Sequence, residues 1–223
     1  MNDTAVAGWR ESKWLALAEF VLVALAMIYR HWLPVSITPY LLLLAWISLR
    51  IRKVSWRSVG LCLYRNWTIS LSLGIAFGLA LEAFELFISQ PLLIRLLAKK
   101  PDLDAFSALR GNLGTTLLYI GFAWTLAAFG EEMVYRGYLM NRVAGLFHNT
   151  RRAWVLSLII VHVAFGLAHI YQGVTGVLDE GLMGLFLGLI YLRAGRNLAV
   201  PIIAHGVSDT IDFLLMFLGK YPV

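Results

Sequence analysis

Apolar segments separated by charged or proline-containing stretches account for most of the 223 residues. Six of them cover approximately residues 14–29, 37–49, 68–88, 153–170, 182–192 and 198–218, and one more starts near residue 113 and continues into the charged stretch 131–142. A helix that spans a bilayer needs about 20 mainly apolar residues. The pattern predicts an all-α fold, a polytopic transmembrane helical bundle of seven helices, or of eight if residues 92–98 form a further span.

The composition supports this interpretation. Hydrophobic residues make up 60% of the chain and charged residues 14%, against about 25% charged residues in soluble domains. With a mean hydropathy of +0.74, the polar surface is too small to cover a water-soluble globule. A disordered protein, a secreted disulfide scaffold and a soluble nucleic-acid binder are therefore excluded. The N-terminus is polar and lacks a small-residue cleavage site, so we interpret the first apolar segment as a retained span.

The distribution of basic residues predicts the orientation in the membrane. If the N-terminus is cytoplasmic, the inside segments hold 12 of the 19 lysines and arginines, the outside segments hold six, and Arg136 lies within a helix. Positive residues concentrate in cytoplasmic loops. We therefore expect a multi-pass protein of a bacterial inner (cytoplasmic) membrane with a cytoplasmic N-terminus and an outside C-terminus. An eighth span would reverse part of this arrangement.

Several ionisable residues lie in or beside apolar segments, where they are costly and often functional. Glu132 and Arg136 are i,i+4 neighbours on a helix and can pair. Glu131 points about 100° away from Glu132 and lacks this partner. One carboxylate can thus be neutralised while its neighbour stays available as a base. The alternative is an ordinary charged helix end near the membrane surface.

Two other segments carry histidines. Phe165 and His169 share a helical face, with His162 seven residues before His169, and His205 and Asp209 are i,i+4 neighbours in the last segment. A single histidine at such a position can equally be a packing residue. Histidines on two helices together with a diacid on a third favour a shared site.

The helix register places these groups at one depth. If the segments form antiparallel hairpins that turn near residues 149–151, 174–177 and 195–196, the depth of Glu131 coincides with those of His169 and of residues 205–209. A carboxylate and an imidazole can together activate water, and a second imidazole can stabilise an oxyanion. A zinc site made of Glu131, His169 and His205 is the alternative, although no HExxH motif is present.

Three motifs in this order resemble the CPBP family of intramembrane proteases, which includes type II CAAX prenyl endopeptidases and bacteriocin-immunity proteins. They are EExxxR (Glu131, Glu132, Arg136), FxxxH (Phe165, His169) and HxxxN/D (His205, Asp209). The resemblance covers approximately residues 113–218, whereas the first 112 residues carry no recognisable motif. We therefore divide one integral membrane domain into N-terminal transmembrane helices, 1–112, and a CPBP-like catalytic core, 113–223.

The resemblance implies a glutamic-type peptidase that requires no metal. In it, Glu131 and His169 activate the catalytic water, His205 and residue 209 form the oxyanion site, and Glu132 and Arg136 support the first helix. Prenyl-processing members carry Asn where this chain has Asp209. An ionised aspartate cannot donate to an oxyanion, so Asp209 must be protonated or must orient His205. This departure argues against prenylated CAAX substrates.

The sequence thus predicts an intramembrane endopeptidase that cuts a membrane-anchored protein or peptide, near its C-terminal region, without nucleic acid as a partner. The predicted topology leaves His169 just before a non-cytoplasmic loop, residues 171–180, which suits the sorting of exported surface proteins. The rivals are a non-catalytic scaffold or immunity protein and a proton-coupled transporter, although transporters usually show repeated halves. Glu82 and Glu85 have no assigned partner, and the small-residue face of Gly181, Gly184 and Gly188 predicts close helix packing.

Overall fold

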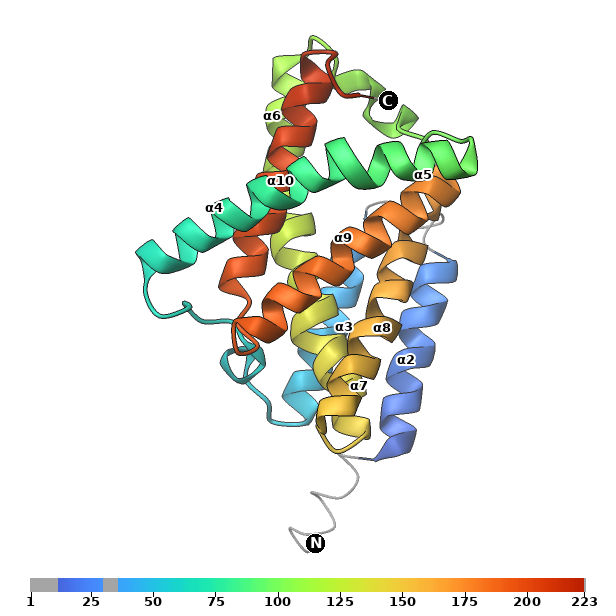
Figure 1. Ribbon diagram of the computed structural model, residues 1–223. Coiled ribbons are helices and arrows are strands. Elements are labelled where there is room, and N and C mark those ends of the chain that lie inside the picture. Colours follow the sequence, from blue (N-terminus) through green and yellow to red (C-terminus); the bar gives the residue numbers. More distant parts are fainter. Residues whose placement is uncertain (1–11, 30–35, 223) are drawn as a thin grey trace, which may run out of the picture.

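The computed structural model describes residues 12–29 and 36–222, which form helices and connecting loops without a strand. In chain order the elements are α2 (Lys13–Ile28), α3 (Thr38–Ile51), η2 (Trp56–Val59), α4 (Trp67–Phe84), η3 (Glu85–Ser89), α5 (Gln90–Leu97), η4 (Asp104–Leu109), α6 (Leu113–Phe122), η5 (Ala123–Met140), α7 (Asn141–Leu146), α8 (Arg151–Ala168), η6 (Ile170–Gln172), α9 (Gly173–Arg193) and α10 (Ala199–Phe217) (Figure 1). The N-terminal segment 1–11, predicted to be cytoplasmic, lies outside the described residues.

Five helical stretches of the described chain are long and apolar enough to cross a membrane. They cover Trp67–Leu97, Leu113–Leu146, Arg151–Ala168, Ile170–Arg193 and Ala199–Phe217. The shorter α2 and α3 pack with them, and large apolar side chains remain exposed along the outer faces, as lipid contact requires. The predicted polytopic helical bundle is therefore confirmed.

The third helical stretch does not end before Pro91, as the sequence indicated. Helices α4, η3 and α5 form one continuous stretch of 31 residues, in which Pro91 occupies the first turn of α5. Proline is tolerated there because the preceding segment, η3, is π-helical, so the hydrogen-bonding pattern already changes before Pro91. Residues 92–98 thus extend the third pass and do not add an eighth one.

The predicted loop 171–180 is wrong, because α9 already begins at Gly173. The charged pair that suggested a loop is accommodated inside the protein. Asp179 accepts a hydrogen bond from the Ser89 hydroxyl at 2.6 Å, and Glu180 accepts one from Gln172 Nε2 at 3.0 Å. Acidic side chains with such partners do not have to terminate a helix. The turn between α8 and α9 is therefore only the short η6.

Side-chain caps define where several helices begin. The side-chain oxygens of Ser12, Asn66, Asn112 and Thr150 each accept a hydrogen bond from a backbone N–H in the first turn of α2, α4, α6 and α8. These N–H groups have no partner within their own helix. Capping is thus the local reason why the apolar stretches begin at these positions.

Glycines set the closest helix contacts. On α8 and α9, a Cβ added at Gly184 would lie 2.7 Å from the Phe165 ring, and one at Gly188 would lie 2.4 Å from the His162 ring. The small-residue face predicted for this segment is therefore confirmed. Gly74 and Gly78 have the same role between α4 and α10, where Ile203 and Val207 occupy the space.

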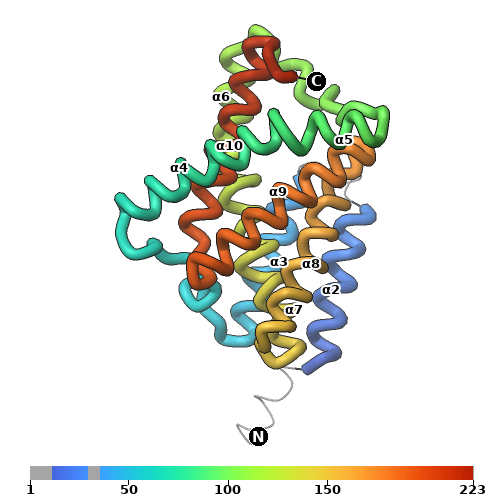
Figure 2. Tube along the Cα trace, in the orientation of Figure 1, coloured from blue at the N-terminus to red at the C-terminus, as the bar shows by residue number. Residues whose placement is uncertain are grey.

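Among the described residues, basic residues lie at both ends of the bundle, nine in or beside the connections at one end and five (Arg95, Lys99, Lys100, Arg110 and Lys220) at the other. The α3–α4, α7–α8 and α9–α10 connections lie in the lower part of Figure 1. Their basic residues, or those of the adjoining helix ends, are Arg50, Arg52, Lys53, Arg57, Arg65, Arg151, Arg152, Arg193 and Arg196. The opposite end holds the α5–α6 connection and the end of α10, where the Gly111 N–H donates to the Phe217 carbonyl at 3.0 Å (Figure 2).

Candidate active site

The helix η5 carries the first motif. Its segment Ala123–Met140 is π-helical, a form that is rare and often found at functional sites. Arg136 Nη1 donates to Glu132 Oε1 at 2.8 Å, and both side chains are fully buried. The predicted i,i+4 ion pair is therefore present. Arg136 Nη2 also donates to the Gly184 carbonyl at 2.7 Å, which ties η5 to α9.

His205 joins the same carboxylate from α10. Its Nδ1 lies 3.0 Å from Glu132 Oε1, and because a carboxylate only accepts, the ring donates this hydrogen bond. Its Nε2 lies 3.6 Å from Asp209 Oδ1. Glu132 thus holds a site histidine as well as Arg136, a link that sequence reasoning did not find because it depends on how α10 packs on η5.

His169 lies at the C-terminal end of α8, where its Nδ1 is 3.0 Å from the Phe165 carbonyl oxygen. A carbonyl only accepts, so Nδ1 carries the hydrogen and Nε2 keeps a free lone pair. The Phe165 ring packs edge-on against Tyr135 and lies under the Arg136 guanidinium, with 4.9 Å to the ring centroid in each case. The FxxxH motif therefore fixes the imidazole against η5.

A cavity of about 490 Å³ unites the candidate residues. Glu131, His169, His205 and Asp209 all line it, so the structure brings together the four groups that the helix register predicted. Thr38 of α3 lies 3.4 Å from Glu131 Oε1, where its hydroxyl donates. The lining does not include Glu132, Arg136 or Phe165. Glu132 and Phe165 contact the lining histidines directly, and Arg136 contacts those two residues in turn, so together they hold the lining in place.

Further polar groups around this cavity were not assigned from the sequence. They are Ser36, Thr38, Glu85, Gln90, Gln172, Asp179, Glu180, Asp212 and Tyr221. Gln90 Nε2 donates to the Tyr221 hydroxyl at 2.9 Å. Burial, followed by the charges of Asp212 and Glu85, raises the pKa of Tyr221 well above its usual range. Only the folding of distant segments brings these residues together, although the charged Asp179 and Glu180 in an apolar region could have indicated an inward face.

The zinc alternative has Glu131, His169 and His205 as its ligands. In the described chain, the group of acidic side chains and histidines whose ligand atoms lie close enough for one ion is Glu82, Glu85 and Asp212, and not Glu131, His169 and His205. Both ring nitrogens of His205 face carboxylates. His162, on the same face of α8 as His169, is buried against α9 and belongs to the helix packing.

These features define a multi-pass helical membrane protein with an internal cavity into which several carboxylates project. Residues 113–211 match the family model described as type II CAAX prenyl endopeptidase Rce1-like. The match covers less than half of the chain and shows that this part is similar to a family of intramembrane endopeptidases. No curated protein and no solved structure matches the chain.

Proposed function

We propose that the protein hydrolyses a peptide bond in or near a membrane-anchored segment, through a water molecule activated by Glu131 and His169. The observation that carries this proposal is the convergence of Glu131, His169, His205 and Asp209 on one cavity from η5, the end of α8 and α10. No serine or cysteine nucleophile is needed, because water supplies the attacking oxygen.

In the proposed first step, the Glu131 carboxylate accepts a proton from water as its oxygen attacks the scissile carbonyl carbon. His169 accepts a hydrogen bond from the same water at Nε2, the nitrogen that its contact with Phe165 leaves free. The water-derived oxygen becomes part of the new carboxyl group. The proton on Glu131 then passes to the leaving amine, so the carboxylate is regenerated.

The second imidazole stabilises the oxyanion in this proposal. His205 is flanked by Glu132 Oε1 at 3.0 Å and Asp209 Oδ1 at 3.6 Å. Two carboxylates favour a positively charged ring, and a fixed positive charge beside the cavity stabilises the tetrahedral intermediate. The distance to Asp209 is that of an ion pair and exceeds that of a hydrogen bond. An ionised carboxylate only accepts, so in this proposal Asp209 acts through the positive charge that it favours on His205 and not as an oxyanion donor.

The position and charge of the cavity suggest the substrate. Its lining includes Pro101, Leu103 and Phe106 of the α5–α6 connection and Tyr221 near the C-terminus, at the end opposite the basic connections. With the N-terminus in the cytoplasm of a bacterial cell, this end faces outward. No lysine or arginine lines the cavity in the described chain, so an acidic peptide would be repelled. We propose the C-terminal anchor region of an exported protein as the substrate.

Labelled water provides the test. Purified, reconstituted protein is incubated in H₂¹⁸O with membrane proteins extracted from cells that lack it, and C-terminal peptides are then analysed by mass spectrometry. The proposal requires new C-termini that carry one ¹⁸O atom, and their loss with Glu131→Gln and with His169→Ala. Asp104→Asn, an exposed acid outside the cavity, is the control and should leave the products unchanged.

Two results would contradict the proposal. New C-termini that appear with the wild type but without ¹⁸O would mean that water is not the nucleophile. If folded Glu131→Gln yields the same products as the wild type, Glu131 does not take part in the reaction. That result would favour a scaffold or immunity role for this chain. Folding of each variant is checked by gel filtration in detergent.

A further inference from the structure

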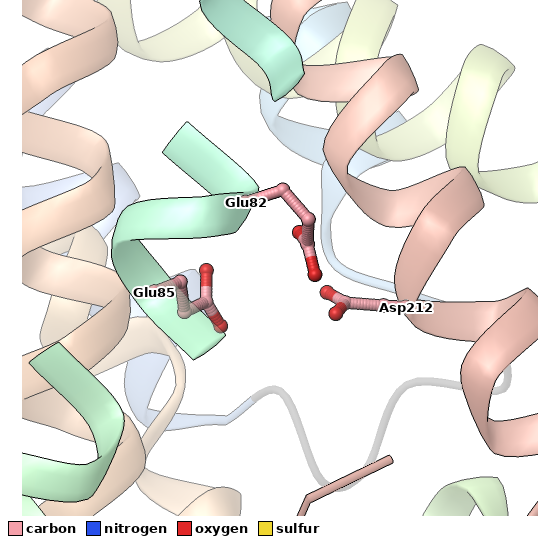
Figure 3. A group of neighbouring side chains, drawn as sticks. All are labelled: Glu82, Glu85 and Asp212. Atoms are coloured by element: carbon pink, nitrogen blue, oxygen red, sulfur yellow. The ribbon is translucent and has the colours of Figure 1, made fainter. Parts of the chain in front are cut away.

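Three carboxylates meet next to the cavity, outside the three family motifs. Glu82 belongs to α4, Glu85 to η3 and Asp212 to α10, and one oxygen of each lies within 4.8 Å of the other two. Figure 3 shows the three side chains pointing toward one another across the interface of the two segments. Gly74 and Gly78 allow this close approach, since α10 side chains occupy the space that their Cβ atoms would need.

Protein partners satisfy these carboxylates only in part. The Ser208 hydroxyl donates to Glu82 Oε2 at 2.7 Å. Glu82 is 2% exposed, yet its Oε1 has no hydrogen-bond partner, and neither does the buried Oδ1 of Asp212. No lysine or arginine of the described residues forms an ion pair with the three acids. Buried carboxylate oxygens without a partner are costly, which indicates either a bound cation or a proton shared between Glu82 and Asp212.

A small cavity provides room for a cation. Its volume is about 50 Å³, and its lining includes Glu85, Ser208, Asp209 and Asp212. One water occupies about 30 Å³ of liquid volume, so the space accommodates an ion or one to two waters. Glu85 and Asp212 also line the main cavity, which gives an ion a route from solvent.

The donor set selects the kind of ion. All ligands are carboxylate oxygens, with neither histidine nor cysteine, and hard cations such as Ca²⁺ and Mg²⁺ prefer such ligands. Two ligands on opposite sides of one ion lie about 4.6–5.2 Å apart for Ca²⁺ and about 4.1 Å apart for Mg²⁺. The three ligand atoms lie within 4.8 Å of one another, which either ion can accommodate. Ca²⁺ coordination is flexible, whereas Mg²⁺ demands near-ideal octahedral geometry, so three carboxylates that the protein fixes in place favour Ca²⁺.

We propose that Glu82, Glu85 and Asp212 bind a divalent cation, Ca²⁺ in preference to Mg²⁺. The ion would neutralise the cluster and hold α4 against α10, on which His205 and Asp209 lie. This site is distinct from the hydrolytic residues and does not depend on the proposed function. The rival explanation is that Glu82 and Asp212 share one proton and bind no ion.

Calcium binding to the purified, EGTA-treated protein in detergent tests the proposal. Titration calorimetry should show Ca²⁺ binding that Mg²⁺ matches only at higher concentration, and Ca²⁺ should raise the Tm by several degrees. Glu85→Gln should weaken Ca²⁺ binding by about tenfold or more, because it removes a charged ligand. Asp179→Asn, an acid of the main cavity outside the cluster, is the matched control and should bind as the wild type does.

A second measurement keeps the test decisive if a variant is unstable. Without Ca²⁺, Glu85→Gln should unfold at a higher temperature than the wild type because repulsion is relieved, whereas with Ca²⁺ the order should reverse. Tb³⁺ luminescence, displaced by Ca²⁺, reports binding directly on the folded fraction. No heat, no Tm change and no Tb³⁺ signal at millimolar ion would overturn the proposal. A Tm that depends on pH but not on Ca²⁺ would establish the shared proton in its place.

Discussion

The buried ion pair of η5 makes a quantitative prediction about stability. Replacing Arg136 by Met keeps an unbranched side chain of similar length but removes the guanidinium from Glu132, Gly184 and the Phe165 ring. Removing one partner of a buried pair costs about 3–5 kcal/mol, because the other charge stays buried without compensation. His205 still donates to Glu132 at 3.0 Å. We therefore expect a loss of stability at the lower end of this range, about 3 kcal/mol.

Thermal unfolding in detergent, followed by tryptophan fluorescence, measures this effect. For a chain of this size, 3 kcal/mol corresponds to a decrease in Tm of about 6–12 °C. The double variant Glu132→Gln/Arg136→Met removes both charges, so it should recover at least half of the loss. The control is Arg142→Met, which breaks the buried pair of Arg142 Nε with Glu19 Oε2 at 2.6 Å. It should lose comparable stability.

Two outcomes would refute this reasoning. One is a Tm of Arg136→Met within 2 °C of the wild type, which would mean that Glu132 is not buried as a charge. The other is a double variant that is no more stable than Arg136→Met, which would mean that lost packing on Phe165, and not the unpaired carboxylate, carries the cost. Activity separates the pairs as well, because Arg142 is not among the cavity-lining residues and its folded variant should keep hydrolysis.

Three other changes test the packing, the site and the topology. Gly188→Ala should lower the stability in thermal unfolding by about 1–3 kcal/mol, since its Cβ would lie 2.4 Å from the His162 ring. The control Gly145→Ala, with open space around its Cβ, should leave the stability unchanged. Thr38→Val should slow cleavage about fivefold, corresponding to about 1 kcal/mol for a lost hydrogen bond, without changing the Tm. A tag after Val223 should be digested by protease added to spheroplasts, and protection of the tag in spheroplasts, with digestion after lysis, would reverse the proposed orientation.

The sequence predicted the helical bundle and several of the contacts around the cavity because both depend on local patterns. Apolar runs define the helices, and the spacings of Glu132 with Arg136 and of Phe165 with His169 are contacts within one helix. Antiparallel hairpins also predicted that Glu131 and His169 lie in one layer, and both line the same cavity.

Other features depend on the packing of segments that are distant in sequence. The sequence gives no rule by which Glu132 would face His205, which is 73 residues away, or Ser208 would face Glu82, which is 126 residues away. The wrong loop at residues 171–180 has the same origin. Charged side chains suggested an exposed turn, whereas Ser89, from another helix, satisfies Asp179 inside the bundle.

The most direct test of the central claim compares membrane-protein C-termini in two otherwise identical strains, one with the wild-type chain and one with Glu131→Gln. The account predicts at least one protein whose shortened C-terminus is abundant in the wild type and whose full-length form accumulates in the variant. Identical C-termini in the two strains, with the variant protein present at the wild-type level in the membrane, would contradict it.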